Sequence, residues 1–332
     1  MLKVVNLKLS DINELVRLTA DKMKLPPSMV EKDFWVSYML EYMFNRFEYK
    51  HLLEFKGGTS LSKGYNLIER FSEDIDVVLN LKVLDVSEAE FNKAKSKNKQ
   101  DEFNKNLLSK SYEFLKNDFY KMIKQGVGIE LIHPHEFIFN EEDASISFKY
   151  PQIYQDPTLL QEIRLEVGAL ASWTPFEVLN IKSFISKYYS GFFNTPEFNV
   201  LTTQAKRTFW EKIVILHKEA HRRNGKTPNR YSRHYYDVYK MIQSNIKDQA
   251  LNDLELLKDV VDFNIKFYPT NWANFEDAKI GTFKLIPSDE TLVKLSKDYD
   301  DMQSMLYGDK PTFAKIIDEI KEFENLLNLQ KV

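Results

Sequence analysis

The feature that most constrains this chain is the order of two short motifs, Gly57-Gly58-Thr59-Ser60 and Asp74-Ile75-Asp76. An apolar segment, Leu52 to Phe55, precedes the first motif, and another, Ile75 to Leu79, overlaps the second, which predicts a strand–turn–helix–strand unit. Side chains two residues apart on a strand project from one face, so the two carboxylates converge. Their repulsion is relieved by a cation, and Mg²⁺ is the cation that takes a few carboxylates together with substrate phosphates.

The glycine turn predicts a phosphate-binding element. Gly57 and Gly58 let the backbone approach a ligand closely, and the helix start after them presents N–H groups to an anion. Ser60, with Thr59 beside it, is expected to bind phosphate and not to act as a nucleophile, because the segment lacks the second glycine of a hydrolase elbow. A phosphate cradle beside a carboxylate pair predicts nucleotidyl transfer. The alternative for the carboxylates is an acidic strand end that faces water.

Two cations near these motifs are candidate phosphate ligands. Lys63 follows the glycine turn and Arg70 precedes the aspartates. Both are also compatible with plain surface charge. Lys63 does not make the turn a Walker loop, because it stands before a glycine and not before Ser or Thr.

These motifs resemble the nucleotidyltransferase superfamily, whose signature is Gly-Gly/Ser-x-Ser followed by Asp-x-Asp. The flanking residues resemble one branch, the AbiEii/AbiGii toxin family of bacterial type IV toxin–antitoxin and phage-abortive systems. The resemblance covers roughly residues 28 to 245 and rests on five segments in order: Val30-Glu31-Lys32-Asp33-Phe34-Trp35, Phe55 to Lys63, Arg70 to Asp76, Thr208-Phe209-Trp210-Glu211-Lys212, and Arg230 to Tyr239.

The resemblance implies a third carboxylate on a later strand. Glu166, in the alternating segment Ile163 to Val167, is the best candidate, as metal ligand or as the base that accepts the hydroxyl proton. Because Glu166 shares a face with Arg164, a structural ion pair is the alternative, and Glu162 is the fallback. The predicted metal ligands are Asp74, Asp76 and Glu166, holding two Mg²⁺ ions.

The resemblance also assigns roles in the second half of the chain. Lys212 is expected to contact the phosphates of the incoming nucleotide, and an ammonium is a compact charge suited to that. Asp237 matches the acidic residue of the fourth family motif, and Arg233 is a further candidate phosphate ligand. The alternatives are a solvated helix lysine at Lys212 and a salt bridge between Arg233 and Asp237, which share a helix face.

The composition is that of a water-soluble, two-domain protein of 332 residues, with 43% hydrophobic and 29% charged residues. The chain has no cysteine, and no apolar stretch is long enough for a signal peptide or a membrane span. We therefore expect a cytoplasmic protein. Residues 201 to 240 hold ten Lys and Arg against three Asp and Glu, although the net charge is −3. This basic run predicts a face for a phosphate-bearing ligand, or else a solvated helix face.

We predict an α+β protein: a nucleotidyltransferase-fold mixed sheet with flanking helices over residues 1–190, then a helical domain over 191–332, with the site in the cleft between them. Residues 85–125 are expected to be a polar helical insertion. Turns are expected at Asn224-Gly225 and Gly308. Expected strands after the Asp pair are 128–132, 137–139, 145–150 and 162–168, and expected helices are 10–24, 28–47, 204–222, 232–245, 250–266, 288–306 and 311–328.

The predicted function is Mg²⁺-dependent transfer of a nucleoside monophosphate from a nucleoside triphosphate (NTP). By resemblance, the acceptor is RNA, at the 3′ end of tRNA, and a separate antitoxin restrains the resulting growth arrest. No dedicated DNA-binding element is seen. Two alternatives stay open: transfer to a protein or to an antibiotic-like small molecule, and a catalytically silent nucleotide- or RNA-binding protein.

Overall fold

The structure is a computed structural model that describes residues 1–72, 74–157, 159–169, 174–222 and 227–329. The chain divides into two compact units. The sheet unit comprises Met1–Tyr65 and Phe71–Thr203, and the helical unit comprises Asn66–Arg70 and Gln204–Val332. The division after Thr203 lies beyond the predicted one at residue 190, because the strand Glu197–Thr203 adds to the sheet.

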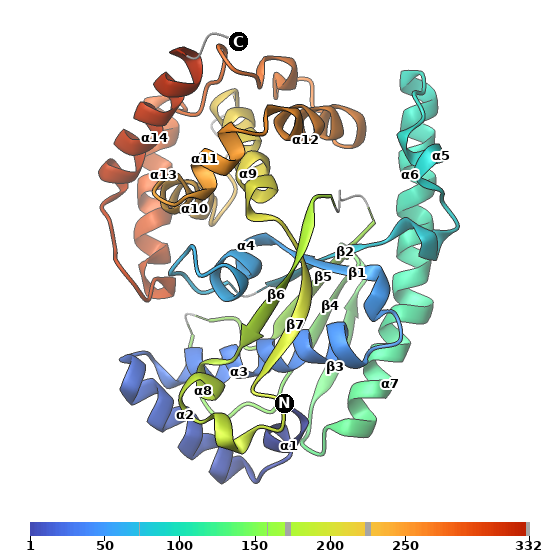
Figure 1. The fold of residues 1–332 in the computed structure, drawn as a ribbon, viewed down its shortest axis with the longest axis vertical. Coiled ribbons are helices and arrows are strands. Elements are labelled where there is room, and N and C mark those ends of the chain that lie inside the picture. Colours follow the sequence, from blue (N-terminus) through green and yellow to red (C-terminus); the bar gives the residue numbers. More distant parts are fainter. Residues whose placement is uncertain (73, 158, 170–173, 223–226, 330–332) are drawn as a thin grey trace. The chain divides into compact units, whose positions relative to one another are not determined.

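Seven strands form one mixed sheet in the order β3-β4-β5-β2-β1-β7-β6 (Figure 1). Within this order β2 runs parallel to β5 and β1 parallel to β7, while the other neighbours are antiparallel. The mixed sheet with packed helices confirms the α+β prediction. The strands are β1 (Leu53–Lys56), β2 (Asp74–Leu79), β3 (Glu136–Asn140), β4 (Ser145–Lys149), β5 (Ile163–Gly168), β6 (Phe176–Lys182) and β7 (Glu197–Thr203).

The core of the sheet unit is built around α3 (Pro27–Glu41), in which every residue from Ser28 to Glu41 is buried. A helix that is enclosed on all sides normally carries apolar residues all round. Its Trp35 packs against the rings of Phe34, Tyr38, Phe148 and Tyr150. The predicted aromatic helix is confirmed, and its last part is a wider π-helical segment, Tyr42–Arg46. Helices α1 (Leu2–Val5), α2 (Leu9–Met23), α4 (Gly57–Thr59) and α8 (Phe184–Tyr188) also belong to this unit.

The predicted polar insertion is helical and longer than expected. It contains α5 (Glu88–Asn92), α6 (Lys97–Phe114), a π-helical segment and α7 (Tyr120–Glu130). Figure 1 shows α6 and α7 following one another as a long column. The Tyr120 hydroxyl donates to the carbonyl oxygen of Phe137 on β3 at 3.0 Å, which ties this column to the sheet edge. The predicted strand over 128–132 is wrong, because buried Ile123 and Val127 lie one helical turn apart and α7 continues through them.

The helical unit confirms the predicted helical texture of the chain after Gln204. Its helices are α9 (Ala205–Ala220), α10 (Ser232–Ile242), α11 (Ile246–Leu251), α12 (Leu254–Phe267), α13 (Asp289–Asp301) and α14 (Phe313–Leu329). Helix α10 lies centrally, in contact with α9, α13 and α14. The predicted turn at Asn224-Gly225 lies outside the described residues.

The segment Asn66–Arg70 packs in the helical unit although it lies between the two motifs in sequence. The N–H of Tyr307 donates to the carbonyl oxygen of Glu69 at 2.9 Å, and Arg70 forms an isolated antiparallel bridge with Leu306. The spacer between the glycine turn and the aspartates therefore leaves the sheet unit and returns to it.

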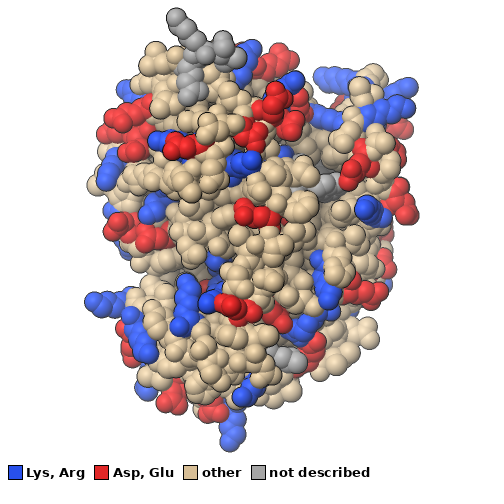
Figure 2. Space-filling view, in the orientation of Figure 1, with Lys and Arg blue, Asp and Glu red and all other residues tan. Residues whose placement is uncertain are grey.

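Charges of both signs are interspersed over the face seen in Figure 2. No helix in the part of the chain that the structure describes is long and apolar enough to cross a lipid bilayer.

Candidate active site

The glycine turn and the second aspartate are in close proximity. Gly57 has φ +78°, a left-handed conformation that favours glycine. A Cβ atom added to Gly57 would lie 1.8 Å from Oδ2 of Asp76, so only a glycine leaves room for that carboxylate. The register explains this proximity, because Lys56 at the end of β1 pairs with Asp76 on β2.

Hydrogen bonds fix the shape of the turn. The Ser60 hydroxyl, fully buried, donates to the carbonyl oxygen of Gly57 at 2.8 Å. The Thr59 hydroxyl donates to the carbonyl oxygen of Asp74 and thereby joins the turn to the first residue of β2. Gly58 is buried between them. The turn and the aspartate strand thus form one local structure.

The three predicted carboxylates lie on two neighbouring strands. Asp74 and Asp76 are half-buried on β2, and Asp76 pairs in parallel register with Glu166 on β5. Residues that pair across neighbouring strands project to the same face of the sheet. Glu166 is exposed, and its Oε1 lies 3.3 Å from Nε of Arg164, as the structural alternative anticipated.

This donor set suits Mg²⁺, which is typically bound by one or two carboxylates together with substrate phosphates. Asp74 and Asp76 supply two carboxylates on one face, beside a glycine turn that leaves space at Asp76. Among the described residues, however, no three acidic, histidine or cysteine side chains are gathered closely enough to hold an ion by themselves. Glu162, the fallback, accepts a hydrogen bond from the Ser147 hydroxyl at 2.7 Å.

Lys63 is buried and paired with an acidic residue. Its ammonium group contacts the carboxylate of Asp33 on α3, and only 7% of the side chain is exposed. Burial lowers the pKa of Lys63, and the attraction of Asp33 opposes that shift. Plain surface charge, one of the two interpretations of Lys63, does not describe this position.

The helical unit gathers three of the predicted residues. The Arg70 guanidinium binds Asp237 in a bidentate manner, with Nε–Oδ1 at 2.7 Å and Nη2–Oδ2 at 2.8 Å. Nζ of Lys212, on α9, lies 2.8 Å from Oδ2 of the same carboxylate. All three side chains are at most 8% exposed. We call Arg70, Lys212 and Asp237 the helical-unit cluster.

Electrostatics in this cluster favour the charged form of Asp237, whereas burial works against the charged form of Lys212. Burial by itself would raise the pKa of Asp237, but Arg70 and Lys212 outweigh it and hold that pKa well below its usual range. Burial lowers the pKa of Lys212, and Asp237 opposes the shift. His234 is kept neutral, because burial and the cations Lys212 and Arg233 lower its pKa. The cluster thus holds two cations on one carboxylate, with Arg233 beside them.

At least half of the ten cations of the basic run form ion pairs within the helical unit. Five of its cations pair with acidic residues: Lys206 with Asp253, Arg207 with Glu211, Lys212 with Asp237, Arg222 with Glu219 and Lys240 with Glu69. The sequence offered two interpretations of the run, a ligand-binding face and a solvated face, and neither included these ion pairs. The pairing shows that tertiary contacts decide where this positive charge is available.

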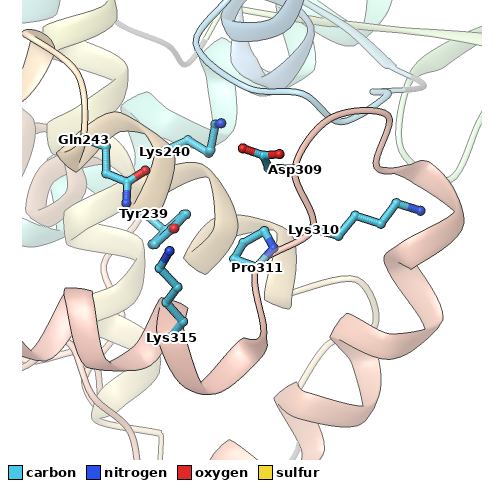
Figure 3. Close-up of a pocket in the computed structure, with 7 residues that line it drawn as sticks. All are labelled: Tyr239, Lys240, Gln243, Asp309, Lys310, Pro311 and Lys315. Atoms are coloured by element: carbon cyan, nitrogen blue, oxygen red, sulfur yellow. The ribbon is translucent and has the colours of Figure 1, made fainter.

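A separate hollow of about 260 Å³ opens in the helical unit. Figure 3 shows its lining: Tyr239, Lys240, Gln243, Asp309, Lys310, Pro311 and Lys315. The Lys310 side chain points away from the others and donates to the carbonyl oxygen of Gln303 at 3.0 Å. Neither Lys212 nor Asp237 lines this hollow, so it contributes nothing to the predicted site.

Glu31, Lys32 and Asp33 are not among the predicted site residues. All three are buried in α3, at no more than 1% exposure. The sequence contained a signal for their burial, because three consecutive charged residues stand inside a predicted helix that is rich in aromatic and aliphatic residues. Such a helix has no polar face on which the three could all be solvated.

A glycine turn that abuts an aspartate pair, on adjacent strands of a mixed sheet, is the arrangement of a nucleotidyltransferase. A sequence model of the family "Nucleotidyl transferase AbiEii toxin, Type IV TA system" matches residues 39–328. The chain belongs to this family and is a nucleotidyltransferase toxin of a type IV toxin–antitoxin system.

One solved structure that the chain resembles is MenT4, a nucleotidyltransferase toxin from Mycobacterium tuberculosis H37Rv. The TM-score is 0.45 and the sequence identity 14%, over 96% of this chain and 99% of that chain. Among curated proteins there is no match.

Proposed function

We propose that this toxin transfers a nucleoside monophosphate from an NTP to RNA in a reaction that requires Mg²⁺, and that its acceptor is the 3′ end of tRNA. A hydroxyl oxygen of the acceptor forms a bond to the α-phosphate and loses its proton, the α–β phosphate link breaks, and pyrophosphate leaves. The observation that carries the proposal is the contact between Gly57 and Asp76, because it brings a phosphate-binding turn and a metal-binding carboxylate to one point. The choice of RNA rests on the family resemblance alone.

The sheet unit would hold the reacting phosphates. Gly57, Gly58, Thr59 and Ser60 would bind the NTP phosphates through their backbone, and Asp74 and Asp76 would bind Mg²⁺. When bound, Mg²⁺ neutralises charge that develops on the phosphates. Glu166, in register with Asp76, would complete the metal site or accept the proton of the attacking hydroxyl, once Arg164 releases its carboxylate.

The helical unit would supply positive charge. Asp237 holds both Lys212 and Arg70 by ion pairs, and their two charges exceed its one. A buried site with surplus positive charge suits a phosphate, and Arg233 would add to it. We therefore propose Lys212 and Arg233 as nucleotide ligands and Asp237 as the residue that keeps Lys212 charged and oriented. The predicted cleft between the two halves stays a prediction.

Labelling tests the proposal directly. The protein is incubated with each [α-³²P]NTP in turn, Mg²⁺, and either total RNA or total cell protein, with Asp76→Asn as the matched control. Label in RNA that is lost in Asp76→Asn supports the proposal. Label in protein or in a small molecule would instead establish one of the alternative acceptors.

Two further outcomes would contradict the proposal. Equal labelling by wild type and Asp76→Asn would remove the aspartate pair from the mechanism. Labelling that survives EDTA would remove the metal. The family also implies a separate antitoxin partner, and its purified form, added to the same assay, tests whether it acts by contact with this chain.

A further inference from the structure

The buried charges Glu31, Lys32 and Asp33 lie on successive residues of α3, yet each has a different partner. Burying a charge is costly unless it is paired or hydrogen-bonded, so three in succession need three separate sets of contacts. Those contacts reach two places in the sheet unit: the turn that carries Gly57 to Ser60, and the loop that leads into β5.

Asp33 holds the turn. One of its carboxylate oxygens, Oδ1, contacts the ammonium of Lys63, and the other, Oδ2, accepts the backbone N–H of Phe184 at 2.7 Å. Lys63 also donates to the carbonyl oxygen of Lys182 at 3.4 Å. Lys63 lies three residues after Ser60 in the same helical turn, so Asp33 fixes the far end of the phosphate-binding turn to α3 and to the start of α8.

Glu31 and Lys32 hold the loop. The Glu31 carboxylate accepts the backbone N–H groups of Ile153 and Tyr154, at 2.6 and 3.0 Å. The Lys32 ammonium donates to the carbonyl oxygen of Leu160 at 2.6 Å. This loop runs into β5, which places Glu166 beside Asp76.

We propose that Glu31, Lys32 and Asp33 are positioning residues for nucleotidyl transfer, and that Lys63 positions the glycine turn through Asp33 and is not itself a phosphate ligand. The inference rests on the proposed function of the Gly57–Ser60 turn. The physical reason is the tight fit at Gly57: a turn in which a single methyl group would collide with Asp76 tolerates little displacement. A displacement of 1 Å at a reacting centre costs about 10²-fold in rate.

The test is a double-mutant cycle of Asp33→Asn and Lys63→Met. Turnover is measured with total RNA and [α-³²P]NTP over a range of NTP concentrations. Each single variant should lower kcat by about 10- to 100-fold and change the KM for NTP by less than about threefold. The double variant should be no worse than the poorer single variant, because both break one contact.

Two controls separate positioning from general stability and from the proposed function. Glu41→Gln removes a partly buried ion pair at the C-terminal end of α3, with Arg46 at 2.6 Å, and should leave kcat unchanged. Asp76→Asn reports on the proposed site. If Asp76→Asn is fully active, the proposed site fails; if Asp76→Asn is inactive and Asp33→Asn matches wild type, only this inference fails.

Amide hydrogen exchange supplies a readout that does not depend on the acceptor. Exchange should accelerate over residues 57–64 and at Phe184 in both single variants, and not in Glu41→Gln. An increase in KM in Lys63→Met that is absent in Asp33→Asn would make Lys63 a direct phosphate ligand and overturn the proposal. An equal loss of kcat in Glu41→Gln would also overturn it.

If Asp33→Asn does not fold, Lys63→Met alone decides. A lower kcat at constant KM with faster exchange supports the proposal, and a higher KM contradicts it.

Discussion

The two parts of the predicted site differ in how they are built. In the sheet unit, Asp74 and Asp76 are half-buried on a strand that follows the glycine turn closely in sequence, and strand register places them. In the helical unit, Arg70, Lys212 and Asp237 are buried and come from three separate segments of the chain. The first arrangement presents half-buried carboxylates on one face of a strand, whereas the second places two cations on one buried carboxylate.

Acidic residues that look alike in the sequence can therefore contribute differently to the free energy of unfolding. We expect a half-buried carboxylate to contribute less to stability than a fully buried one, so its replacement should affect chemistry more than stability. A buried carboxylate with two cationic partners contributes to both, because its loss leaves the partners uncompensated.

Asp76→Asn should abolish transfer, a loss on the order of 10³-fold or more, while the melting temperature changes by little. We propose that this half-buried carboxylate supplies charge to the metal, and its removal relieves repulsion with Asp74. Labelling assays and thermal unfolding check this, with exposed Asp118→Asn as the matched control. Loss of both activity and stability in Asp76→Asn would erase the contrast between the two parts.

Gly57→Ala should lower activity by about 10²-fold and destabilise the fold by roughly 1–3 kcal/mol, because φ is +78° and the new methyl group would meet Asp76. Gly128→Ala is the control. Gly128 lies in α7 with nothing within 4 Å of an added Cβ, so alanine there should be neutral or stabilising by up to about 1 kcal/mol. Similar behaviour of the two variants would show that the space at Asp76 is unimportant.

Lys212→Ala should reduce kcat/KM for NTP by about 10- to 100-fold, the value of one charged contact of roughly 1.5–3 kcal/mol. Mg²⁺ dependence should stay as in wild type, since the proposed partner of Lys212 is phosphate. Lys206 lies on the same helix as Lys212, and its ion pair with Asp253 is more exposed. Lys206→Ala should therefore change kcat/KM for NTP by little. Kinetics of Lys212→Ala that match wild type would refute its assignment as a nucleotide ligand.

The contributions of Asp237 and Glu31 to stability should change with pH in opposite directions. The pKa of Asp237 is lowered in the folded state, so its contribution to stability is complete above about pH 4 and is lost as the pH falls further. Burial raises the pKa of Glu31 to about 7, although two N–H groups oppose the shift. The folded state therefore binds the Glu31 proton more tightly, and stability falls as the pH rises from about 4.5 to 7, by up to about 3 kcal/mol.

Urea unfolding followed by hydrogen exchange at a series of pH values measures both effects. At neutral pH, Asp237→Asn should be less stable than wild type by about 3–5 kcal/mol. Below pH 4, the variant should lose less of its remaining stability than wild type does. Glu31→Gln should remove the slope between pH 4.5 and 7 in the sheet unit. Parallel pH profiles for wild type and either variant would contradict the corresponding assignment.

Much of the fold followed from local patterns in the sequence. The alternating residues Ile163 to Val167 predicted β5, and the long amphipathic segments after Gln204 predicted α9, α10, α13 and α14. Errors arose where local pattern and tertiary context disagree. Residues 128–132 resemble a strand in isolation, but α7 extends over their first part because its buried face continues to Val127. Neither β6 nor β7 was predicted. β6 is an edge strand of the sheet, and most of its residues are exposed.

By itself, the sequence determined the α+β class, the glycine turn, the aspartate pair and their proximity, because these depend on strand periodicity and on residues close together in the chain. Only the tertiary structure decided the ionic partners: Asp33 for Lys63, and Asp237 for Arg70 and Lys212. The physical reason is that a charged side chain is indistinguishable in sequence from a solvated one. Its role depends on burial and on a partner 30 or 167 residues away, and the folded core alone brings the two together.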